Sequence, residues 1–467
     1  MSSADKGEVT TTITATTHVT LPPRSNAELN PKSKATEFFG PIGTAAVTFG
    51  TPFTAYALFY TCNEVTGCAP SGAAGWQTMF DNLAHWPTVA GQWWDWTAAG
   101  VYLAWYTWVV VCWAVLPGEW VEGNLLRDGS RKKYKMNGLW ALILTLGVVA
   151  GVLANPGGID RFTWVYEHWV PLLSASLVMA TAQALWVYVW SFKSGELLAL
   201  GGNSGVFIYD FFLGRPLNPT FPGFPNFDIK TFNEVRPGII GWVVLNISCA
   251  CAQYKKHGYV SDSMWSVLAF EIYYAFDCLL TEPVILNQMD ITTDGFGFML
   301  SFGDLTWLPF TYGLQARYLV FSPVHLGPYF TAAVVALEVI GLYIFRVSNN
   351  EKSDFRNGKN PKNLTYMETQ RGTRLLTSGW WGRSRHPNYL GDWIMAWAWC
   401  LPTGFKSPVP YFYVVYFAVL LVHRQMRDDE ACKEKYGKDW DKYCKLVPYK
   451  IIPYVIIPLR ISRDSLS

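Results

Sequence analysis

The chain has 467 residues, of which 51% are hydrophobic and only 15% are charged, about 60% of the charged share of an average soluble protein. This balance excludes a disordered chain, and a net charge of +2 leaves no global field that would draw a nucleic acid. The 23 Trp and 25 Tyr are residue types that settle at membrane interfaces. The composition therefore predicts an all-α, polytopic integral membrane protein in contact with membrane lipid and without a nucleic-acid partner.

The first 39 residues lack the apolar core of a signal peptide, and their polar, Thr-rich character predicts a mobile cytosolic tail. The nine Cys include no C-x-x-C pair, so no metal site is expected. Cys62 and Cys68 form a disulfide if their loop faces an oxidising lumen, and two free thiols are the equally weighted alternative.

Apolar stretches near the length that crosses a hydrocarbon core of ~30 Å predict ten membrane spans, with ends uncertain by several residues. They fall at about 40–62, 96–116, 137–155, 169–191, 237–254, 263–286, 297–320, 325–345, 387–404 and 409–422.

The distribution of Lys and Arg predicts the orientation of these spans, because basic residues resist translocation. With a cytosolic N-terminus, 32 of the 37 basic residues fall in cytosolic pieces, and the pair Lys255 and Lys256 is the one misfit. Both termini are therefore predicted to be cytosolic. We divide the chain into a tail (1–39), eight spans with a substrate pocket (40–346), and a cofactor-binding region (347–467) with the last two spans and cytosolic helices.

Two predicted spans carry polar stripes, which are costly in a membrane unless they face a cavity or a partner. At 100° per residue, one stripe falls within an arc of about 80°. It comprises Glu271, Tyr274, Cys278 and Glu282. The next span carries Asp304, Thr311 and Gln315, flanked by Trp307 and Tyr312. These stripes either wall a pocket or join helices by hydrogen bonds, at about even odds.

A break between these two spans, residues 289–298, contains two glycines and the acids Asp290 and Asp294, with no Lys or Arg nearby in the sequence. Irregular backbone at membrane depth is tolerated where it lines a cavity. An exposed acidic turn is the alternative.

The C-terminal third mixes cations, aromatic rings and amides in the segments 352–362, 378–392, 423–428 and 435–443. Such a mixture suits a phosphorylated nucleotide, since cations bind phosphates and rings stack on bases. A basic belt on anionic lipid is the alternative, at about one in five. Neither the G-x-G-x-x-G fingerprint nor a P-loop is present, so a dinucleotide would need a membrane-embedded site.

Four segments taken together resemble the sterol reductase family, most closely its fungal delta-14 branch, over about residues 40–456. They are Tyr209-Asp-Phe-Phe-Leu-Gly-Arg-Pro-Leu-Asn-Pro219, the run Asp290 to Asp304, Leu375 to Asp392 with its Gly-Trp-Trp-Gly and Arg-His-Pro-Asn-Tyr elements, and Val447-Pro-Tyr-Lys-Ile-Ile-Pro453. The resemblance implies an NADPH-dependent enzyme of the endoplasmic reticulum membrane with ten helices, which saturates the C14=C15 double bond in sterol synthesis.

The resemblance also implies roles for individual residues. The cofactor residues are Lys352 and Arg356 (phosphates), Trp381 and Asn388 (nicotinamide), Arg424, Asp428, Tyr436 and Tyr443 (adenosine and its phosphates), with His386 and Asp392 in the same element as Asn388. Tyr274 matches a tyrosine beside the nicotinamide.

An isolated double bond accepts hydride only after protonation, so the site needs an acid opposite the nicotinamide. We expect Tyr274 to be this acid or the last link of a relay, with Glu271, Glu282, Asp290 and Asp294 as candidate proton suppliers. The stripe from Asp304 to Gln315 is expected to line the sterol pocket.

Three alternatives remain at this point. A sterol reductase of another double bond, delta-7 or C24(28), shares the family. A membrane methyltransferase using S-adenosylmethionine shares the Arg-His-Pro-Asn-Tyr pattern, but only near its C-terminus. A non-catalytic sterol-binding scaffold is the third. The oligomeric state is left open.

Overall fold

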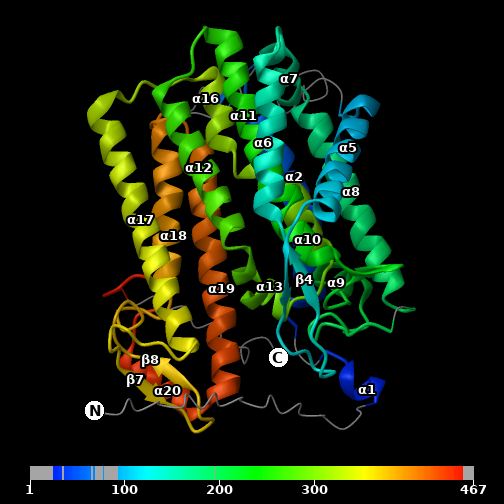
Figure 1. Ribbon diagram of the computed structural model, residues 1–467, viewed down its shortest axis with the longest axis vertical. Helices are drawn as coiled ribbons and strands as arrows, with labels where there is room; N and C mark the ends of the chain where they lie inside the picture. Colours follow the sequence, from blue (N-terminus) through cyan, green and yellow to red (C-terminus); the bar gives the residue numbers. More distant parts are fainter. Residues whose placement is uncertain are drawn as a thin grey trace, which may run out of the picture.

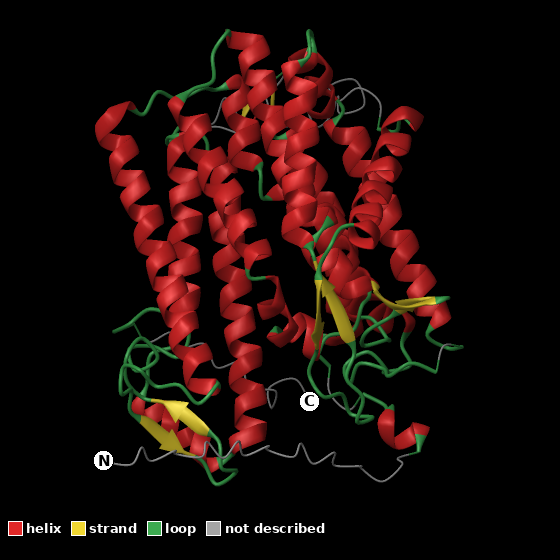
Figure 2. Ribbon diagram, viewed as in Figure 1, coloured by secondary structure: helices red, strands yellow, loops and turns green. Residues whose placement is uncertain are grey.

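The computed structural model describes residues 25–33, 36–64, 67–68, 77, 93–193 and 195–455. The chain is mostly helical, and its long helices run side by side as a bundle (Figures 1 and 2). The helices are α1 (Asn26–Leu29), α2 (Gly40–Tyr60), α5 (Trp96–Val115), α6 (Gly138–Ala154), α7 (Gly158–Glu167), α8 (Trp169–Trp190), α9 (Phe207–Leu213), α10 (Ile229–Val235), α11 (Pro237–His257), α12 (Asp262–Leu280), α13 (Met289–Thr292), α14 (Phe298–Phe302), α15 (Leu308–Thr311), α16 (Leu314–Phe321), α17 (Gly327–Arg356), α18 (Pro387–Cys400), α19 (Phe412–Tyr436) and α20 (Lys438–Leu446).

Short elements complete the fold. Four two-stranded antiparallel hairpins pair β1 (Cys62–Asn63) with β2 (Gly67–Cys68), β3 (Glu119–Glu122) with β4 (Lys133–Met136), β5 (Thr220–Phe221) with β6 (Phe224–Asp228), and β7 (Tyr366–Glu368) with β8 (Arg374–Leu376). Three 3₁₀ turns are η1 (Glu282–Asn287), η3 (Leu401–Thr403) and η4 (Val409–Tyr411), and η2 (Gly303–Trp307) is a π-helical turn.

The prediction of a polytopic membrane protein is confirmed in its coarse form. Among the described residues, six helices are long and apolar enough to cross a membrane, and a seventh span is added if α6 and α7 count as one bent element. These six, together with α6, lie at seven of the ten predicted positions. The remaining three positions are occupied by a broken segment, by the 14-residue α18 and by α19, which carries charged residues in its second half.

The predicted span at 297–320 is not one continuous helix, which corrects the sequence interpretation. It is divided into α14, η2, α15 and α16, and Pro309 and Gly313 stand where the helix breaks. A π-turn adds a residue to the helical repeat and shifts every side chain after it. The stripe drawn from Asp304 to Gln315 on a straight helix is therefore wrong in geometry.

The predicted span at 263–286 also ends early, because α12 stops at Leu280 and η1 begins at Glu282, with Pro283 as its second residue. Glu282 therefore leaves the face of Glu271 and Tyr274. Its carboxylate forms an ion pair with Arg236 at 2.7 Å and accepts the backbone N–H of Gly138 at 2.8 Å. These contacts identify Glu282 as a buried structural acid, which argues against the predicted role as a proton supplier.

The helices α17 and α18 pack unusually closely, and two glycines allow it. A side-chain carbon at Gly341 would lie 2.8 Å from the carbonyl oxygen of Gly391, and one at Gly391 would lie 2.5 Å from the backbone nitrogen of Phe345. Any larger residue at either position would push the backbones apart. This contact fixes the two helices that carry Lys352, Arg356, Asn388 and Asp392, four of the ten predicted cofactor residues.

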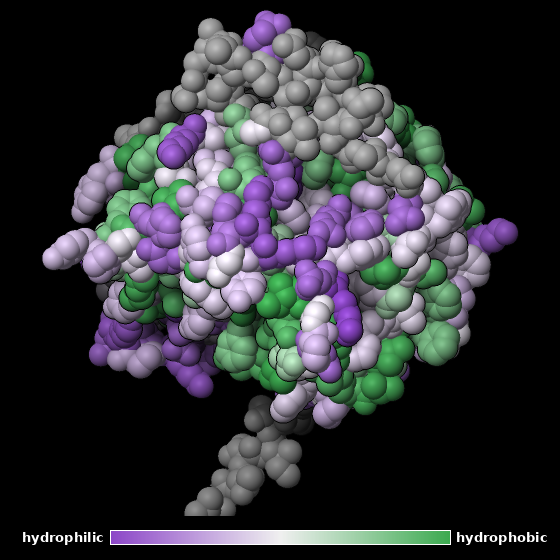
Figure 3. All heavy atoms as spheres, turned by 90° about the horizontal axis from the view of Figure 1, so that it is seen from above, coloured by the Kyte–Doolittle hydropathy of each residue, from purple (hydrophilic) through white to green (hydrophobic). Residues whose placement is uncertain are grey.

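The two ends of the bundle differ in character. The hairpin β7–β8, α20 and the ends of α17 and α19 lie at one end, together with α1 (Figure 1). The opposite end carries the disulfide Cys62–Cys68, which the structure forms where the sequence left two options open. Figure 3 views this second end and shows hydrophilic residues gathered across its middle.

The pair Lys255 and Lys256, which did not fit the charge rule, is neutralised by acids on neighbouring segments. Lys255 Nζ lies 3.0 Å from the carboxylate of Glu167, and Lys256 Nζ lies 3.6 Å from that of Glu64.

The end of the predicted N-terminal tail is anchored. Asn30 accepts the backbone N–H of Leu198 at 2.8 Å, and Glu37 lies 3.1 Å from Arg427 on α19. Phe38 packs against His423 with ring centroids 4.9 Å apart. The tail boundary at residue 39 is thus too late, and residues 1–24 lie outside the described part.

Candidate functional site

The acidic break between the two polar segments is held by a close backbone contact. Gly214 has a φ of +89°, and a side-chain carbon there would lie 2.3 Å from the carbonyl carbon of Phe296 and 2.4 Å from the backbone nitrogen of Gly297. Only glycine fits at this contact. The Gly-Arg-Pro element and the Gly-Phe-Gly element therefore meet in space, although about 80 residues separate them.

The fully buried Lys230 also fixes this break, through hydrogen bonds from its ammonium group. Its Nζ donates to the carbonyl oxygens of Ile291 at 2.9 Å and Asp294 at 2.8 Å. A lysine without exposure is costly unless its donors are satisfied, so this arrangement fixes the backbone of the break. A lysine shortly before a predicted span is the sequence signal that could have indicated this buried contact.

The two acids of the break form ion pairs with α19, so the alternative of an exposed acidic turn is wrong. Asp290 pairs with Arg424, and Asp294 makes a two-pronged contact with Arg427 at 2.6 and 3.0 Å. The side chain of Asp294 is 5% exposed. Both carboxylates are thus paired with cations that are distant in the sequence. This pairing favours a positioning role for Asp290 and Asp294 over their predicted role as proton suppliers.

Tyr274 lies in an aromatic enclosure near the middle of the bundle. Its ring meets Trp399 of α18 edge to face at 5.1 Å and Trp242 of α11 at 6.4 Å. The Asp392 carboxyl of α18 is the polar partner of its hydroxyl. An acid beside a phenol can return a proton to it after the phenol has donated one.

The predicted phosphate contacts lie on the last turns of α17. The Lys352 ammonium lies 4.1 Å from the centre of the Trp381 ring, whose indole N–H donates to the Ser348 carbonyl at 2.7 Å. Arg356, one turn further, is exposed. Among the described residues, neither cation has a carboxylate within ion-pair distance, so both are available to a polyanion.

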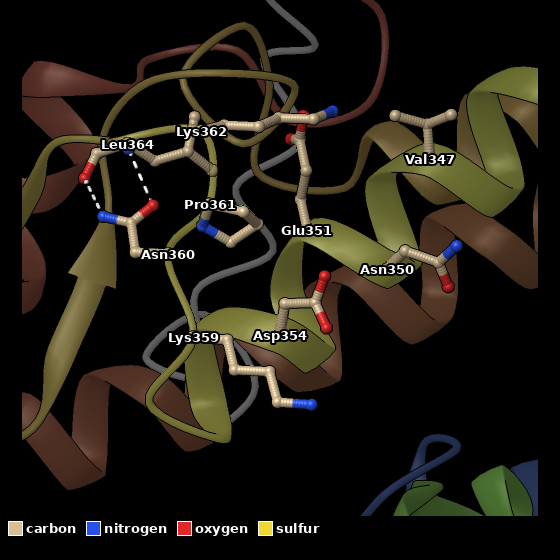
Figure 4. A pocket seen from close by; sticks show the side chains of 9 residues that line it. All are labelled: Val347, Asn350, Glu351, Asp354, Lys359, Asn360, Pro361, Lys362 and Leu364. Carbon is tan, nitrogen blue, oxygen red and sulfur yellow. Dashed lines mark hydrogen bonds and ion pairs between the residues drawn. The ribbon is translucent and has the colours of Figure 1, made fainter.

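A surface pocket opens at the C-terminal end of α17 (Figure 4). It lies between the end of α17 and the loop that follows, and Lys362 closes one side with a 3.0 Å contact to Glu351. Its lining includes neither Lys352 nor Arg356, and two of its walls are acidic, at Glu351 and Asp354. The pocket is therefore separate from the predicted cofactor residues.

Asn388 begins α18 with a buried side-chain oxygen that has no hydrogen-bond partner. A buried acceptor without a partner is costly, and it marks a place where a bound group supplies the missing donor. A carboxamide, such as that of a nicotinamide, carries suitable N–H donors.

His386, two residues before Asn388, is stacked on Tyr389 at 4.8 Å, with its Nδ1 3.8 Å from the Asp428 carboxylate. Burial, with Lys352 nearby, holds the pKa of the His386 imidazole well below its ordinary value. The ring is therefore neutral near pH 7, and its contact with Asp428 is not an ion pair.

The last predicted cofactor residues lie on an aromatic stack at the end of α19 and on α20. Tyr436 stacks on Trp440 at 6.3 Å, and Trp440 meets Tyr443 at 5.1 Å. Arg385 bridges this stack to α19 through a 2.7 Å contact with Asp429. Tyr443 is buried, whereas Tyr436 is partly exposed.

Residues 447–453 hold the Arg-His-Pro element in place. The backbone N–H groups of Arg385 and His386 donate to the carbonyl oxygens of Tyr449 and Lys450, each at 2.9 Å. The third and fourth of the family-like segments therefore form one unit, as the first and second do.

The residues predicted for the sterol pocket separate into two groups. Trp307 and Tyr312 face α19, at 5.1 Å from Tyr416 and 4.8 Å from Tyr413, and form an aromatic wall. Thr311 instead donates to the carbonyl of Trp307 within its own helix, and Gln315 donates to the Cys400 sulfur at 3.2 Å. Asp304 is buried, with one carboxylate oxygen without a partner.

Polar residues of the two stripes form hydrogen bonds between helices. Gln315 to Cys400 and Asn246 to Glu271 are helix-to-helix bonds, as the second interpretation of the stripes expects. Sequence reasoning missed Glu338, the only acid between residues 325 and 345, although an acid in a span is itself a signal.

Comparisons with known proteins agree with the resemblance seen in the four segments. The model of the ergosterol biosynthesis ERG4/ERG24 family matches residues 32–456. The chain is 47% identical over 420 residues to delta(14)-sterol reductase erg24 of Schizosaccharomyces pombe, which covers 89% of this chain and 96% of the relative.

Two other yeasts supply similar relatives. The delta(14)-sterol reductase ERG24 of Saccharomyces cerevisiae is 42% identical over 442 residues, and that of Candida albicans is 41% identical over 450 residues. Each alignment covers 91% of this chain and 98% of the relative. The predicted family is therefore confirmed, and the chain belongs to the ergosterol biosynthesis ERG4/ERG24 family.

Proposed function

We propose that this chain reduces the C14=C15 double bond of a sterol with NADPH as the hydride donor. The assignment as a delta(14)-sterol reductase of ergosterol biosynthesis rests on the relatives of that name, which align over about nine-tenths of the chain. Within the family, that agreement favours the delta-14 bond over the delta-7 and C24(28) bonds. A methyltransferase or an inert scaffold loses support, because the family model spans residues 32–456.

The residues at the cytosol-facing ends of α17, α18 and α19 fit NADPH. The observation that carries the proposal is the buried acceptor of Asn388 without a partner, close in sequence to Trp381 and His386. Lys352 and Arg356 offer charge for phosphates, and Tyr436, the partly exposed end of its stack with Trp440, offers a ring for an adenine. When bound, NADPH supplies the hydride.

The chain itself supplies the proton and the environment for charge. We propose that the Tyr274 hydroxyl protonates carbon 15 and that Asp392 restores the proton. A tertiary cation then develops at carbon 14 of the sterol. The rings of Trp399 and Trp242 meet the Tyr274 ring edge to face, and an aromatic enclosure of this kind favours such a cation.

The activity is tested by incubating the purified protein with NADPH and an 8,14-diene sterol, and analysing the sterols by mass spectrometry. A gain of two hydrogens at the 14,15 position is expected. Parallel incubations with a delta-7 sterol and a C24(28)-methylene sterol serve as controls. Reduction of either control in preference to the 8,14-diene would contradict the delta-14 assignment.

Cofactor binding is tested by two single variants, Arg424→Gln and Asn388→Leu, since Leu removes the side-chain oxygen that an Asp would keep. Each removes one contact to the nucleotide, and a charge-assisted hydrogen bond contributes about 1.5–3 kcal/mol. We expect the Kd for NADPH to rise tenfold or more in both. The unfolding temperature of the Asn388 variant should stay close to that of the parent, whereas Arg424→Gln also loses its ion pair with Asp290 and should unfold at a lower temperature. Unchanged NADPH affinity in both variants would refute this cofactor site.

Asp290→Asn separates a positioning role from a proton-donating role. The variant loses the ion pair that holds Arg424, so we expect the Kd for NADPH to rise several-fold while kcat at saturating NADPH changes little. If Asp290 supplied the proton, kcat would fall and the Kd would stay constant. Binding and turnover measured on the same preparation decide between the two.

We also propose ten spans in the endoplasmic reticulum membrane, with α14 to α16 forming one broken span and both termini in the cytosol. The basic segments on α17, α19 and α20 and the opposite position of the disulfide support this orientation. A reporter inserted after Asn155 should read lumenal, and one after Asn357 cytosolic. The reverse pattern would invert the topology.

We propose that the sterol and the cofactor are bound by different parts of the chain. Residues 40–346 carry the sterol pocket, and residues 347–467 carry the cofactor region.

A further inference from the structure

Polar side chains gather inside the bundle, between α11, α12, α16, α17 and α18. They are Trp242, Asn246, Glu271, Gln315, Glu338 and Trp399, which we call the inner polar cluster. Each is nine-tenths or more buried, with Glu338 the most exposed at 6%. The surrounding side chains are the apolar and aromatic residues of the bundle core.

Several polar atoms in the inner polar cluster lack a hydrogen-bond partner. Asn246 donates to Glu271 and Gln315 to Cys400, and the indole N–H groups of Trp242 and Trp399 face the Glu271 and Glu338 carboxyls. The amide oxygens of Asn246 and Gln315 and the remaining carboxyl oxygens of Glu271 and Glu338 are unmatched. Within the described residues, neither carboxyl forms an ion pair with a cation. So many unmatched buried atoms in one place call for a bound polar group.

The two carboxyl groups differ from those that the fold uses for support. Glu282, Asp290 and Asp294 each face an arginine. An unpaired buried carboxyl is held as the neutral acid, because its charged form is far too costly away from water. A neutral carboxylic acid can both donate and accept a hydrogen bond, which is what a hydroxyl group requires.

The inner polar cluster adjoins the proposed proton donor on the side away from the cofactor residues. Glu271 precedes Tyr274 by three residues, so the two side chains share one face of α12. Trp399 touches both regions, with its ring 5.1 Å from that of Tyr274. On α17, Lys352 follows Glu338 by 14 residues, which corresponds to about 21 Å along the helix at 1.5 Å per residue. Tyr274 thus stands between the two sets of residues.

We propose that the inner polar cluster binds the 3-hydroxyl group of the sterol, with Glu338 and Glu271 as its main contacts. This inference rests on the proposed function. A sterol is an apolar ring system with one hydroxyl at the end remote from its 14,15 bond. The bundle interior is aromatic at Tyr274 and polar at the inner polar cluster, one helical turn away. It therefore matches the distribution of apolar and polar groups in a sterol. Anchoring the hydroxyl there would present the double bond to Tyr274.

The test compares an 8,14-diene sterol with its 3-deoxy counterpart, at saturating NADPH. In the parent protein, we expect KM for the 3-deoxy sterol to be about tenfold higher, the size of one buried hydrogen bond. Glu338→Leu should abolish this preference by raising KM for the hydroxylated sterol alone. Glu338→Gln, which keeps a donor and an acceptor, should retain much of the preference.

Ser266→Ala is the matched control, because Ser266 is buried on α12 but bonds only to the Asp262 carbonyl at 2.8 Å. Its preference for the hydroxylated sterol should equal that of the parent. The same comparison made on the parent by sterol-induced thermal stabilisation needs no variant, and it tests the proposal even if Glu338→Leu does not fold.

Two outcomes would overturn the proposal. One is a parent protein that reduces and binds both sterols equally well. The other is a Glu338→Leu variant that lowers kcat for both sterols by the same factor at unchanged KM, which would make the cluster a proton store. A parent that reduces neither sterol would instead refute the proposed function, so the two failures are distinguishable.

Discussion

Replacing Tyr274 by Phe should lower turnover by about 10²-fold or more while NADPH affinity and thermal stability stay near those of the parent. The substitution removes one hydroxyl and keeps the ring that packs against Trp399 and Trp242. The loss corresponds to the usual contribution of a general acid. Single-turnover reduction of an 8,14-diene sterol at saturating NADPH measures the chemical step directly.

The neighbouring residue provides a matched control. Tyr273→Phe makes the same chemical change one position away, on an exposed side of α12. Its turnover should equal that of the parent. If Tyr274→Phe also retained full turnover, the proton would have to come from another group, and Asp392 would be the next to test because it is the polar partner of Tyr274.

The largest effect on stability is expected from Glu282→Gln. Arg236 and Glu282 have side chains that are 1% and 3% exposed, and their charged groups lie 2.7 Å apart. Removing one charge leaves the other buried without its partner, at a cost of about 3–5 kcal/mol. We expect a clear fall in the thermal unfolding temperature of the detergent-solubilised protein.

A surface ion pair shows what the same substitution does without burial. Glu122 lies 3.9 Å from Lys133, and both side chains are more than half exposed. Glu122→Gln should therefore change stability by less than about 1 kcal/mol. If Glu282→Gln were as stable as Glu122→Gln but lost turnover, the earlier assignment of Glu282 as a proton supplier would return.

The long helices were predictable because each is a local property of the chain. The apolar stretches at 40–62, 96–116 and 169–191 match α2, α5 and α8 within one or two residues. Length and hydropathy suffice where a helix is continuous. The prediction fails at 297–320, because a π-turn and a proline inside an apolar stretch do not alter its hydropathy.

The site shows a similar division. Residue types and four family-like segments were enough to indicate the family and to name the candidate cofactor residues, which the fold gathers at the ends of α17, α18 and α19. The sequence could not tell that Asp290 and Asp294 face Arg424 and Arg427, more than 130 positions away. A carboxylate that is isolated in the sequence was therefore taken for a free acid.

By itself, the sequence determined the membrane class, most of the helix positions and the family, since these follow from composition, periodicity and local segments. Only the tertiary structure decided which buried acids are neutralised and which are not. Glu282, Asp290 and Asp294 meet arginines, whereas Glu271 and Glu338 meet none among the described residues. The physical reason is that the role of a buried charge depends on the groups within a few ångströms of it, and only folding brings those groups together.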